Sequence, residues 1–374
     1  MQYEAKCTKC KSYSSNPLNY KCSCGSPLEV STKSTFRKEA IKKNNYTIWR
    51  YSEFFPYIER NQIVSLGEGW SPLIRFAKNV YFKLDFLNPT GSFKDRGSSV
   101  LISSVHRIIK GMNGYISEDS SGNAGASIAA YAARAGLRAR IYVPADVSGH
   151  KFNQIIFYGA EVERVAGNRG KVAAEAQKLE KGKFYIGHIW HPIFRDGIKT
   201  LTYEIFEQLE WMLPNRIYLP VSAGTLLLGV IRGLEDLVDS GIIEEFPKVI
   251  ACQTRQVSPL YHRLKNLLYT PPEKVTLIAD ALVSTNPPLL DLMVEKMREI
   301  GGDAEMVDED EIYSAFIELA RSGFHVEPSS AVAYAAYKKH VEKGEISGDE
   351  ISVIVLTGFG LKSRLSPEDT NLFA

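Results

Sequence analysis

Residues 88–97 read NPTGSFKDRG, and the rest of the chain is organised around this stretch. A proline and a glycine end the preceding apolar run, and Ser92 with Asp95 three positions later is typical of a capping box that begins a helix. We expect that helix to reach about residue 110. Lys94 would lie in its first turn, where the positive end of the helix dipole favours the neutral amine over the ammonium ion. A neutral lysine amine is a nucleophile that can form a Schiff base, whereas the alternative is a solvated surface lysine.

The composition is that of an ordinary globular protein. The chain has 374 residues, of which 44% are hydrophobic and 24% charged, so it is long enough for two domains with substantial cores. A net charge of +2 argues against a nucleic acid or a membrane surface as the main partner. No apolar run reaches the ~18 residues of a membrane span, and residues 1–30 are unlike a signal peptide. We therefore expect a cytoplasmic protein without a nucleic-acid or membrane partner.

Four of the five cysteines cluster near the amino terminus, at Cys7, Cys10, Cys22 and Cys24. Two close pairs on facing knuckles can supply four thiolates to a tetrahedral zinc ion, and a segment too small for its own core would need one. A structural ion is favoured over a catalytic one because four thiolates leave no open position. The second pair has one intervening residue where two are usual, so a metal-free or disulfide-bonded knuckle is the alternative.

Apolar runs alternate with helical patterns through most of the chain. We expect strands at 138–144, 161–165, 216–220 and 352–356, separated by helices of ten to fifteen residues. This rhythm is typical of a parallel sheet with helices on both faces. Ligands in such folds bind at the carboxyl ends of the strands.

Two small-residue turns lie where such ligands would bind. Residues 120–126 read SSGNAGA and precede a helix that we expect to end at Gly136. Backbone N–H groups at such a turn can seat an anion, here a substrate carboxylate, although a simple capped helix is the alternative. The candidate substrate-binding residues are Ser120, Ser121, Gly122, Ala124 and Gly125. Residues 221–226 read VSAGTL and join a strand to a helix, which is a weak signal for a phosphate cradle when taken alone.

These stretches resemble, in the same order, the motifs of threonine synthases, which belong to the second fold type of pyridoxal 5'-phosphate (PLP) enzymes. The similar segments are LGEG at 66–69, NPTGSFKDRG at 88–97, SSGNAG at 120–125, GIKT at 197–200, EPSSA at 327–331 and TGFGLK at 357–362. The resemblance implies that Lys94 carries PLP as the catalytic residue and that Asn123 binds the ring hydroxyl oxygen. It implies a phosphate cup made of Ser222, Ala223, Gly224, Thr225 and Leu226. Thr357 would meet the ring nitrogen and leave it neutral, which suits elimination and replacement better than transamination.

The resemblance also implies an architecture. It predicts an α/β protein of PLP fold type II, with two three-layer αβα domains, the active site between them and a small zinc-ribbon-like module. We assign the module to residues 1–30, the domain with the lysine to 31–205, and the domain with the phosphate cup and ring-nitrogen partner to 206–374. The alternative that part of residues 31–90 packs on the other domain is left open. The family resemblance suggests a homodimer.

One region departs from the family pattern. The family usually has an arginine two residues after a proline, to which the resemblance assigns the substrate phosphate, but here Phe194 takes that place and Arg195 follows. His188, Ile189 and His191 replace the expected polar set, and Ala124 stands where a hydroxyl residue is common. We take Arg195 as the remaining substrate-binding candidate. Two histidines three apart without a third ligand do not indicate a metal.

The predicted activity is conversion of O-phosphohomoserine and water to threonine and phosphate by a PLP-dependent lyase. The departures leave open a different amino-acid substrate on the same fold and cofactor. That alternative comprises a serine or threonine ammonia-lyase, or a beta-replacement enzyme such as O-phosphoserine sulfhydrylase or cysteate synthase. A non-catalytic binding protein that uses its cysteine ribbon is the alternative from another class.

Overall fold

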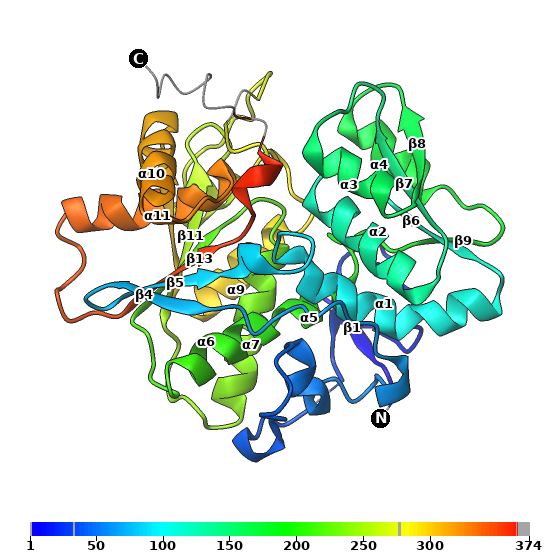
Figure 1. The fold of residues 1–374 in the computed structure, drawn as a ribbon, viewed down its shortest axis with the longest axis horizontal. Coiled ribbons are helices and arrows are strands. Elements are labelled where there is room, and N and C mark those ends of the chain that lie inside the picture. Colours follow the sequence, from blue (N-terminus) through cyan, green and yellow to red (C-terminus); the bar gives the residue numbers. More distant parts are fainter. Residues whose placement is uncertain (1, 33, 276–277, 364, 366–374) are drawn as a thin grey trace. The chain divides into compact units, whose positions relative to one another are not determined.

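The computed structural model describes residues 2–32, 34–275, 278–363 and 365 (Figure 1). The chain forms two compact units that interleave along the sequence. The first unit comprises residues 1–70, 88–204 and 228–244, and the second comprises 71–87, 205–227 and 245–374. Within the described ranges, the helices are too short or too polar to cross a bilayer.

A four-stranded sheet forms the centre of the first unit, in the order β8-β7-β6-β9. Its strands are β6 (Tyr115–Glu118), β7 (Ala139–Pro144), β8 (Glu161–Val165) and β9 (Lys183–Tyr185). The helices that alternate with them are α1 (Lys94–Gly111), α2 (Asn123–Ala135), α3 (His150–Phe157) and α4 (Arg169–Gln177). All three strand pairings are parallel, which confirms the prediction from the alternating pattern.

The amino-terminal part of the first unit contains a small antiparallel sheet. It consists of β1 (Ala5–Cys7), β2 (Tyr13–Ser14) and β3 (Leu28–Val30), with β1 in the middle. The connecting stretch that follows carries the 3₁₀ helices η1 (Lys38–Ala40), η2 (Ile48–Phe54) and η3 (Arg60–Gln62). Further along, α5 (Pro192–Ile198) packs against α1 and β3. The next helix, α6 (Thr200–Gln208), begins after a break at Lys199, so the GIKT segment at 197–200 spans the junction of two short helices.

A six-stranded sheet forms the second unit, in the order β12-β11-β10-β13-β5-β4. Its strands are β4 (Leu73–Ala77), β5 (Val80–Leu84), β10 (Arg216–Pro220), β11 (Lys248–Thr254), β12 (Asp303–Val307) and β13 (Ser352–Leu356). The pairings are parallel except that of the edge strand β4 with β5. The helices are α7 (Thr225–Asp239), α8 (Pro259–Leu264), α9 (Leu290–Glu299), α10 (Glu309–Arg321) and α11 (Pro328–Glu342), with 3₁₀ turns η4 (Asp85–Leu87) and η5 (Gly360–Lys362). From Leu228 onward, α7 belongs to the first unit.

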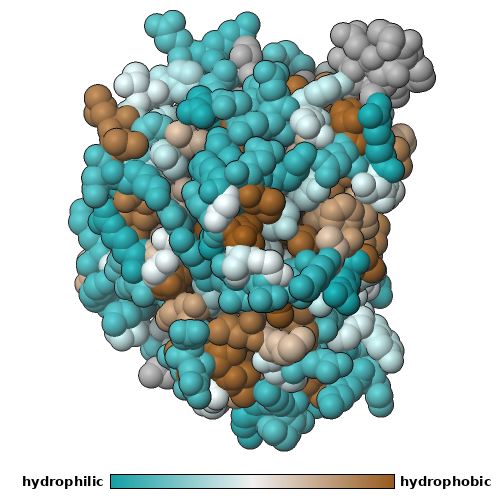
Figure 2. Space-filling view, turned by 90° about the vertical axis from the view of Figure 1, so that its left-hand side faces the viewer, coloured by the Kyte–Doolittle hydropathy of each residue, from teal (hydrophilic) through white to brown (hydrophobic). Residues whose placement is uncertain are grey.

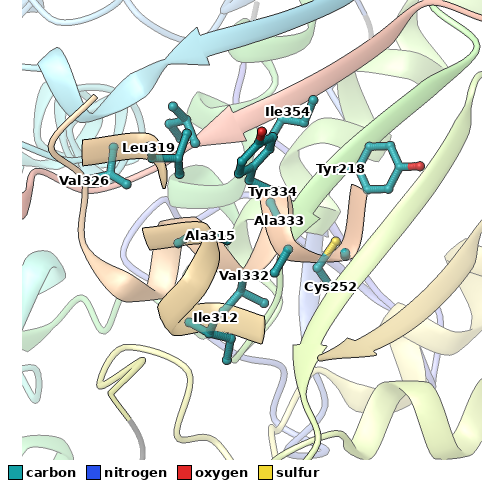
Figure 3. Close-up of a cluster of buried hydrophobic side chains, with 14 of the residues drawn as sticks. Tyr218, Cys252, Ile312, Ala315, Leu319, Val326, Val332, Ala333, Tyr334 and Ile354 are labelled. Carbon is teal, nitrogen blue, oxygen red and sulfur yellow. The ribbon is translucent and has the colours of Figure 1, made fainter. Parts of the chain in front are cut away.

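Apolar side chains from α10 and α11 pack on the sheet of the second unit (Figure 3). Leu319 and Val332 are fully buried, as is Ile354 on β13. Burying one such side chain stabilises the fold by roughly 1.5–3 kcal/mol. Alanines along α11, including Ala333, allow the helix to approach the strands closely. This core therefore fixes β13, and with it the position of the residues that follow β13.

Exposed apolar side chains are spread over separate segments. Phe157 lies on α3, while Leu179 and Leu268 lie in loops. Figure 2 shows brown patches interspersed with teal on the face that it draws. Single exposed apolar residues are normal on folded proteins and need no partner.

Candidate active site

The turn before α1 holds Lys94 at the first position of the helix. Phe93 occupies the N-cap position in a right-handed helical conformation, and no side chain of the described residues makes a capping hydrogen bond there. Ser92 is buried, and its hydroxyl has no hydrogen-bond partner among the described residues. The carboxylate of Asp95 instead accepts hydrogen bonds from the backbone N–H and the hydroxyl of Thr90, at 2.7 and 2.6 Å. The predicted helix is confirmed, but the predicted capping box is wrong because Asp95 closes the loop on Thr90.

Contacts of α1 with neighbouring helices restrain the Lys94 turn further. Ser127 on α2 donates a hydrogen bond to Asp95 over 2.6 Å. Gly97 on α1 lies so close to α5 that a Cβ atom there would come within 2.6 Å of the Phe194 ring. The glycine in the motif is therefore required for helix packing. Phe194 accordingly forms part of the wall near Lys94.

The Lys94 side chain is partly buried among apolar groups. Its Nζ lies 4.4 Å from the ring centre of Phe93 and 5.9 Å from that of Phe194. Burial lowers the pKa of Lys94 to about 7, and the charge of Arg169 acts in the same direction, whereas Glu118 opposes the shift. Burial is the largest cause, ahead of any charged neighbour. A substantial fraction of Lys94 is consequently a neutral amine at neutral pH.

The turn between β6 and α2 and the start of α2 hold the predicted substrate-binding residues Ser120, Ser121, Gly122, Ala124 and Gly125, whereas Arg195 lies on α5. Ser120 accepts a hydrogen bond from the backbone N–H of Gly122 over 3.3 Å. At Gly125 a Cβ atom would collide with the carbonyl of Ser120, so only glycine fits. Asn123 begins α2, and the helix ends at Gly136 as predicted. Gly136 has the left-handed conformation. The first-turn N–H groups at this helix start suit a carboxylate.

Arg195 lies elsewhere in the first unit. Its guanidinium donates hydrogen bonds to the carbonyls of Ile189, at 2.8 Å, and Trp190, at 3.2 Å, and also to Leu28 on β3. These bonds tie α5 to the amino-terminal sheet and engage the guanidinium of Arg195, whose role in substrate binding stays a prediction. His191 is fully buried, and burial lowers its pKa to about 3, so its ring is neutral.

Glu118 and His188 form a buried pair that the sequence did not predict. Their strands β6 and β9 are parallel neighbours, with Ser117 opposite Tyr185, so the strand ends lie together. His188 Nδ1 lies 2.6 Å from one Glu118 carboxyl oxygen, and the His188 backbone N–H donates to the other over 2.9 Å. Burial raises the pKa of Glu118 to about 8 and lowers the pKa of His188 well below its usual value. A glutamate at the end of a buried strand was the available signal.

The LGEG loop is fixed by Glu68, a residue of the motif for which the sequence predicted no role. Its buried carboxylate accepts hydrogen bonds from the Trp49 indole at 2.9 Å, the Ser99 hydroxyl at 2.6 Å and the Tyr131 hydroxyl at 2.7 Å. Ser99 lies on α1 and Tyr131 on α2. Glu68 thus connects the loop to the two helices that carry the Lys94 and Ser120 turns.

In the second unit, the turn between β10 and α7 has the form expected of a phosphate cradle. The predicted residues Ser222, Ala223, Gly224, Thr225 and Leu226 lie together in this turn and the start of α7. Gly224 has a φ of 96°, and a Cβ atom there would collide with Met293. The Ser222 hydroxyl accepts a hydrogen bond from Ser284 N–H over 3.3 Å. Backbone amides at a glycine-containing helix start suit phosphate oxygens.

Thr357 follows β13 in the second unit and is buried. Its hydroxyl lies 2.9 Å from that of Ser330, in the EPSSA segment at the start of α11. Ser330 also accepts hydrogen bonds from the backbone N–H groups of Thr357, at 3.0 Å, and Gly358, at 2.8 Å. Ser330 therefore orients the Thr357 hydroxyl, a role that the sequence did not reveal.

The four amino-terminal cysteines converge in the first unit. Their sulfurs all lie within 4.8 Å of one another, and none of the four is in a disulfide. The Sγ atoms of Cys7 and Cys24 are 3.5 Å apart, as are those of Cys10 and Cys22. A tetrahedral zinc ion with bonds of ~2.3 Å would separate its sulfurs by about 3.8 Å. The residues therefore fit a structural zinc ion.

Comparisons with known proteins identify the family of this chain. A family model described as "Pyridoxal-phosphate dependent enzyme" matches residues 64–358. The chain is 35% identical to a threonine synthase from Methanocaldococcus jannaschii and 33% identical to one from Methanosarcina acetivorans, in both cases over 96% of this chain and 92% of the relative.

Solved structures of other enzymes share the fold. A threonine deaminase isoform from Solanum lycopersicum superposes with a TM-score of 0.70 at 19% identity, covering 91% of this chain and 89% of its own. Maize serine racemase superposes with a TM-score of 0.69 at 20% sequence identity, covering 91% of this chain and 98% of its own. The predicted α/β fold type is thereby confirmed.

Proposed function

We propose, from the premise that this chain belongs to the family of pyridoxal-phosphate-dependent enzymes, that it is a lyase of threonine-synthase type. The reaction is conversion of O-phosphohomoserine and water to threonine and phosphate. The observation that carries this proposal is Lys94, whose pKa burial lowers to about 7 at the start of α1. Similarity to threonine synthases over nearly the whole chain supports the substrate class.

The residues that would hold the cofactor have separate tasks. Lys94 would bind PLP covalently, and Asn123 would bind its ring hydroxyl oxygen. Ser222, Ala223, Gly224, Thr225 and Leu226 would bind its phosphate, and Thr357 its ring nitrogen. PLP, when bound, supplies a conjugated ring that withdraws electrons from the carbon next to the substrate amino group. The Gly224 turn and the hydroxyl of Thr357 held by Ser330 fit these tasks.

Side chains and backbone groups of the protein have the remaining roles in the reaction. As a neutral amine, Lys94 can remove the proton from the α-carbon and deliver protons in later steps. The N–H groups of the turn at 120–125 would bind the substrate carboxylate. Orienting the α C–H bond for transfer is the largest expected contribution, because a correctly placed acceptor avoids the entropic cost of encounter.

A second candidate rests on Phe194, which occupies the place where the resemblance expects a phosphate-binding arginine. Phe194 is fully buried against Gly97, and Arg195 bonds to backbone carbonyls instead. This arrangement favours the alternative that the same fold serves another amino-acid substrate. That group comprises serine or threonine ammonia-lyases and beta-replacement enzymes such as O-phosphoserine sulfhydrylase or cysteate synthase.

A substrate panel tests the two candidates. The purified protein is incubated separately with phosphohomoserine, with threonine, and with phosphoserine plus sulfide. Release of threonine and phosphate from phosphohomoserine alone is expected. Ammonia release from threonine, or a sulfur amino acid from phosphoserine, would select the alternative. Failure to bind PLP would leave only a non-catalytic binding role.

The substrate class, partners, localisation and oligomeric state are inferred from the family resemblance. The substrate is a small amino acid, and the protein has no nucleic-acid or membrane partner. The enzyme is a cytoplasmic homodimer, and light scattering would measure its mass. The ribbon of Cys7, Cys10, Cys22 and Cys24 holds one structural zinc ion, because four thiolates fill its coordination.

A further inference from the structure

The cysteine ribbon contacts the segment that forms the wall near Lys94. We call residues 185–195 the wall segment, which runs from the end of β9 into α5. It contains His188, which bonds to Glu118, and Phe194, whose ring centre lies 5.9 Å from Lys94 Nζ. The function proposed above gives the ribbon a structural ion and leaves its contacts with the wall segment unexplained.

The first contact between the ribbon and the wall segment is aromatic. Tyr20 lies two positions before Cys22, and its ring packs edge-on against that of Tyr185, with the ring centres 4.7 Å apart. Tyr20 and Trp190 pack against the same buried cluster, to which Tyr185 belongs. Next to Tyr20, Lys21 Nζ lies 5.7 Å from the ring centre of Trp190. The ribbon loop before Cys22 therefore covers the first half of the wall segment.

Tyr185 connects this contact to the predicted substrate-binding turn. Its hydroxyl donates a hydrogen bond to Asp119 over 2.6 Å, and Asp119 directly precedes Ser120. Gly187 leaves room for this bond, because a Cβ atom there would come within 2.0 Å of the Tyr185 hydroxyl oxygen. A ring in the ribbon thus restrains the tyrosine that holds the residue next to the turn.

The second contact is polar and lies at the other end of the wall segment. Arg195 donates hydrogen bonds to the carbonyl of Leu28 on β3 and, at 2.8 Å, to the carbonyl of Ile189. Leu28 lies directly opposite Cys7 in the pairing of β3 with β1. Arg195 is almost completely buried, so its guanidinium needs these acceptors. The wall segment is therefore attached to the ribbon at both ends, and each attachment lies close to a predicted zinc ligand.

The ribbon depends on its cysteines for a fixed conformation. Each of its strands β1, β2 and β3 has only two or three residues. A segment of this size is too small for a core of its own, so four thiolates around one ion hold it together. Without the ion, the positions of Tyr20 and Leu28 are no longer fixed.

We propose that the ribbon is a positioning element of the substrate site, which holds the wall segment through Tyr20 and Arg195. Both are positioning residues, because they act through Tyr185 and the backbone of the wall segment. Loss of the Tyr20 ring, or of the ion that orders the ribbon, loosens the wall segment and the turn that begins at Ser120. Substrate binding thereby depends on the ribbon, a consequence that rests on the proposed function.

Hydrogen exchange of the full-length protein tests the attachment without any substrate. The backbone N–H groups of Ile186 and Trp190 donate hydrogen bonds over 3.0 Å, so their exchange reports opening of the wall segment. We expect exchange in peptides of the wall segment to be about tenfold faster in Tyr20→Ala, because an aromatic contact that closes the segment is lost. Peptides from β12 in the second unit should be unchanged.

Two further variants separate the aromatic contact from a general effect on the ribbon. Tyr20→Phe keeps the ring and should exchange like the wild type. Tyr13→Ala is the matched control, because Tyr13 lies on β2 of the same ribbon and is 60% exposed. It should also exchange like the wild type. Equal protection of the wall segment in Tyr20→Ala and the wild type would overturn the proposal.

Removal of zinc from the wild type is a second measurement, which decides the matter if Tyr20→Ala does not fold. After dialysis against a chelator, with the loss of zinc confirmed by mass spectrometry, the wall segment should exchange about tenfold faster. Added zinc should restore its protection. A wall segment that stays protected while the ribbon peptides exchange freely would show that the ribbon does not position it. A purified protein that holds no zinc would overturn the dependence on the ion.

Kinetics with phosphohomoserine measure the consequence that rests on the proposed function. Tyr20→Ala should raise KM by about tenfold and leave kcat nearly unchanged, because the turn binds the carboxylate equally in the ground state and the transition state. Tyr13→Ala should change neither constant. A fall in kcat at constant KM would contradict the positioning of the turn. The exchange result does not require turnover, so a wrong substrate assignment would leave it intact.

Discussion

Arg96 and Glu204 form a fully buried, two-bonded ion pair, with Nη1 to Oε1 at 2.6 Å and Nη2 to Oε2 at 2.7 Å. Arg96 lies two residues after Lys94 on α1, and Glu204 lies on α6. Glu204 also accepts a hydrogen bond from the backbone N–H of Trp70, just after the LGEG loop, over 2.8 Å. One carboxylate therefore connects the lysine-bearing helix, α6 and that loop.

Breaking this pair should destabilise the protein strongly. Arg96→Met leaves Glu204 as a buried charge without its counterion, and we expect the free energy of unfolding to fall by about 3–5 kcal/mol. Denaturant unfolding measures the change. The double variant Arg96→Met with Glu204→Leu removes both charges and should recover much of the loss. If the single variant is as stable as the wild type, the pair does not fix α1.

Replacing Lys94 tests the central assignment. Lys94→Ala should lose both the yellow colour of bound PLP and turnover, because no amine remains to bind the aldehyde or move the proton. Visible absorbance after dialysis and the substrate panel measure the two effects. The control is Lys110→Ala, because Lys110 is exposed and lies in the last turn of the same helix. This variant should retain both the colour and the turnover. Colour and turnover that survive in Lys94→Ala would contradict the proposed function.

The lowered pKa of Lys94 should cost stability. Burial lowers the pKa of Lys94 from its ordinary value to about 7, so the unfolded chain binds more protons than the folded one between that pH and about 10.4. The penalty is complete below about pH 7 and disappears as the pH approaches 10.4.

The cofactor-free Lys94→Met variant avoids this penalty. We expect it to be more stable than the wild type by about 1–3 kcal/mol near neutral pH, allowing for solvent screening of the partly exposed side chain. The difference should shrink as the pH rises, which a series of denaturation curves would show. A stability difference that does not vary with pH would mean that Lys94 is an ordinary charged lysine.

Gly224 should be required for the phosphate cradle. Gly224→Ala introduces a Cβ atom at a φ of 96°, where it also collides with Met293. We expect PLP affinity to fall by about tenfold or more, since the turn must shift by an amount that misplaces its N–H groups. A PLP titration followed by absorbance measures this. Gly348→Ala, which enters open space, should not change the affinity.

The cysteine cluster should bind one zinc ion per chain. Cys10→Ser removes one of four ligands, and we expect the zinc content measured by mass spectrometry to fall to near zero after dialysis against a chelator. Cys252→Ser is the control, because Cys252 is buried on β11 in the other unit and should leave the zinc content unchanged. A wild-type protein free of zinc after expression in zinc-supplemented medium would exclude the site.

Much of the fold follows from local sequence pattern. The strands β8, β10 and β13 begin and end at the residues expected, because short runs with β-branched and other apolar residues, bounded by turn residues, specify a strand locally. The lysine turn and the two small-residue turns can also be recognised from the local sequence. Their backbone geometry depends on glycines at particular positions, such as Gly224.

Only the tertiary structure decided which side chains meet. Ser92 and Asp95 have the spacing of a capping box, but packing against Thr90 and Ser127 gave Asp95 different partners. Arg195, a substrate-binding candidate in the sequence, donates a hydrogen bond to the carbonyl of Leu28, which is far away in the sequence. Strand order brought Glu118 beside His188, seventy positions later. Sequence spacing determines local conformation, whereas contacts between distant segments, and the burial that shifts a pKa, depend on how the whole chain packs.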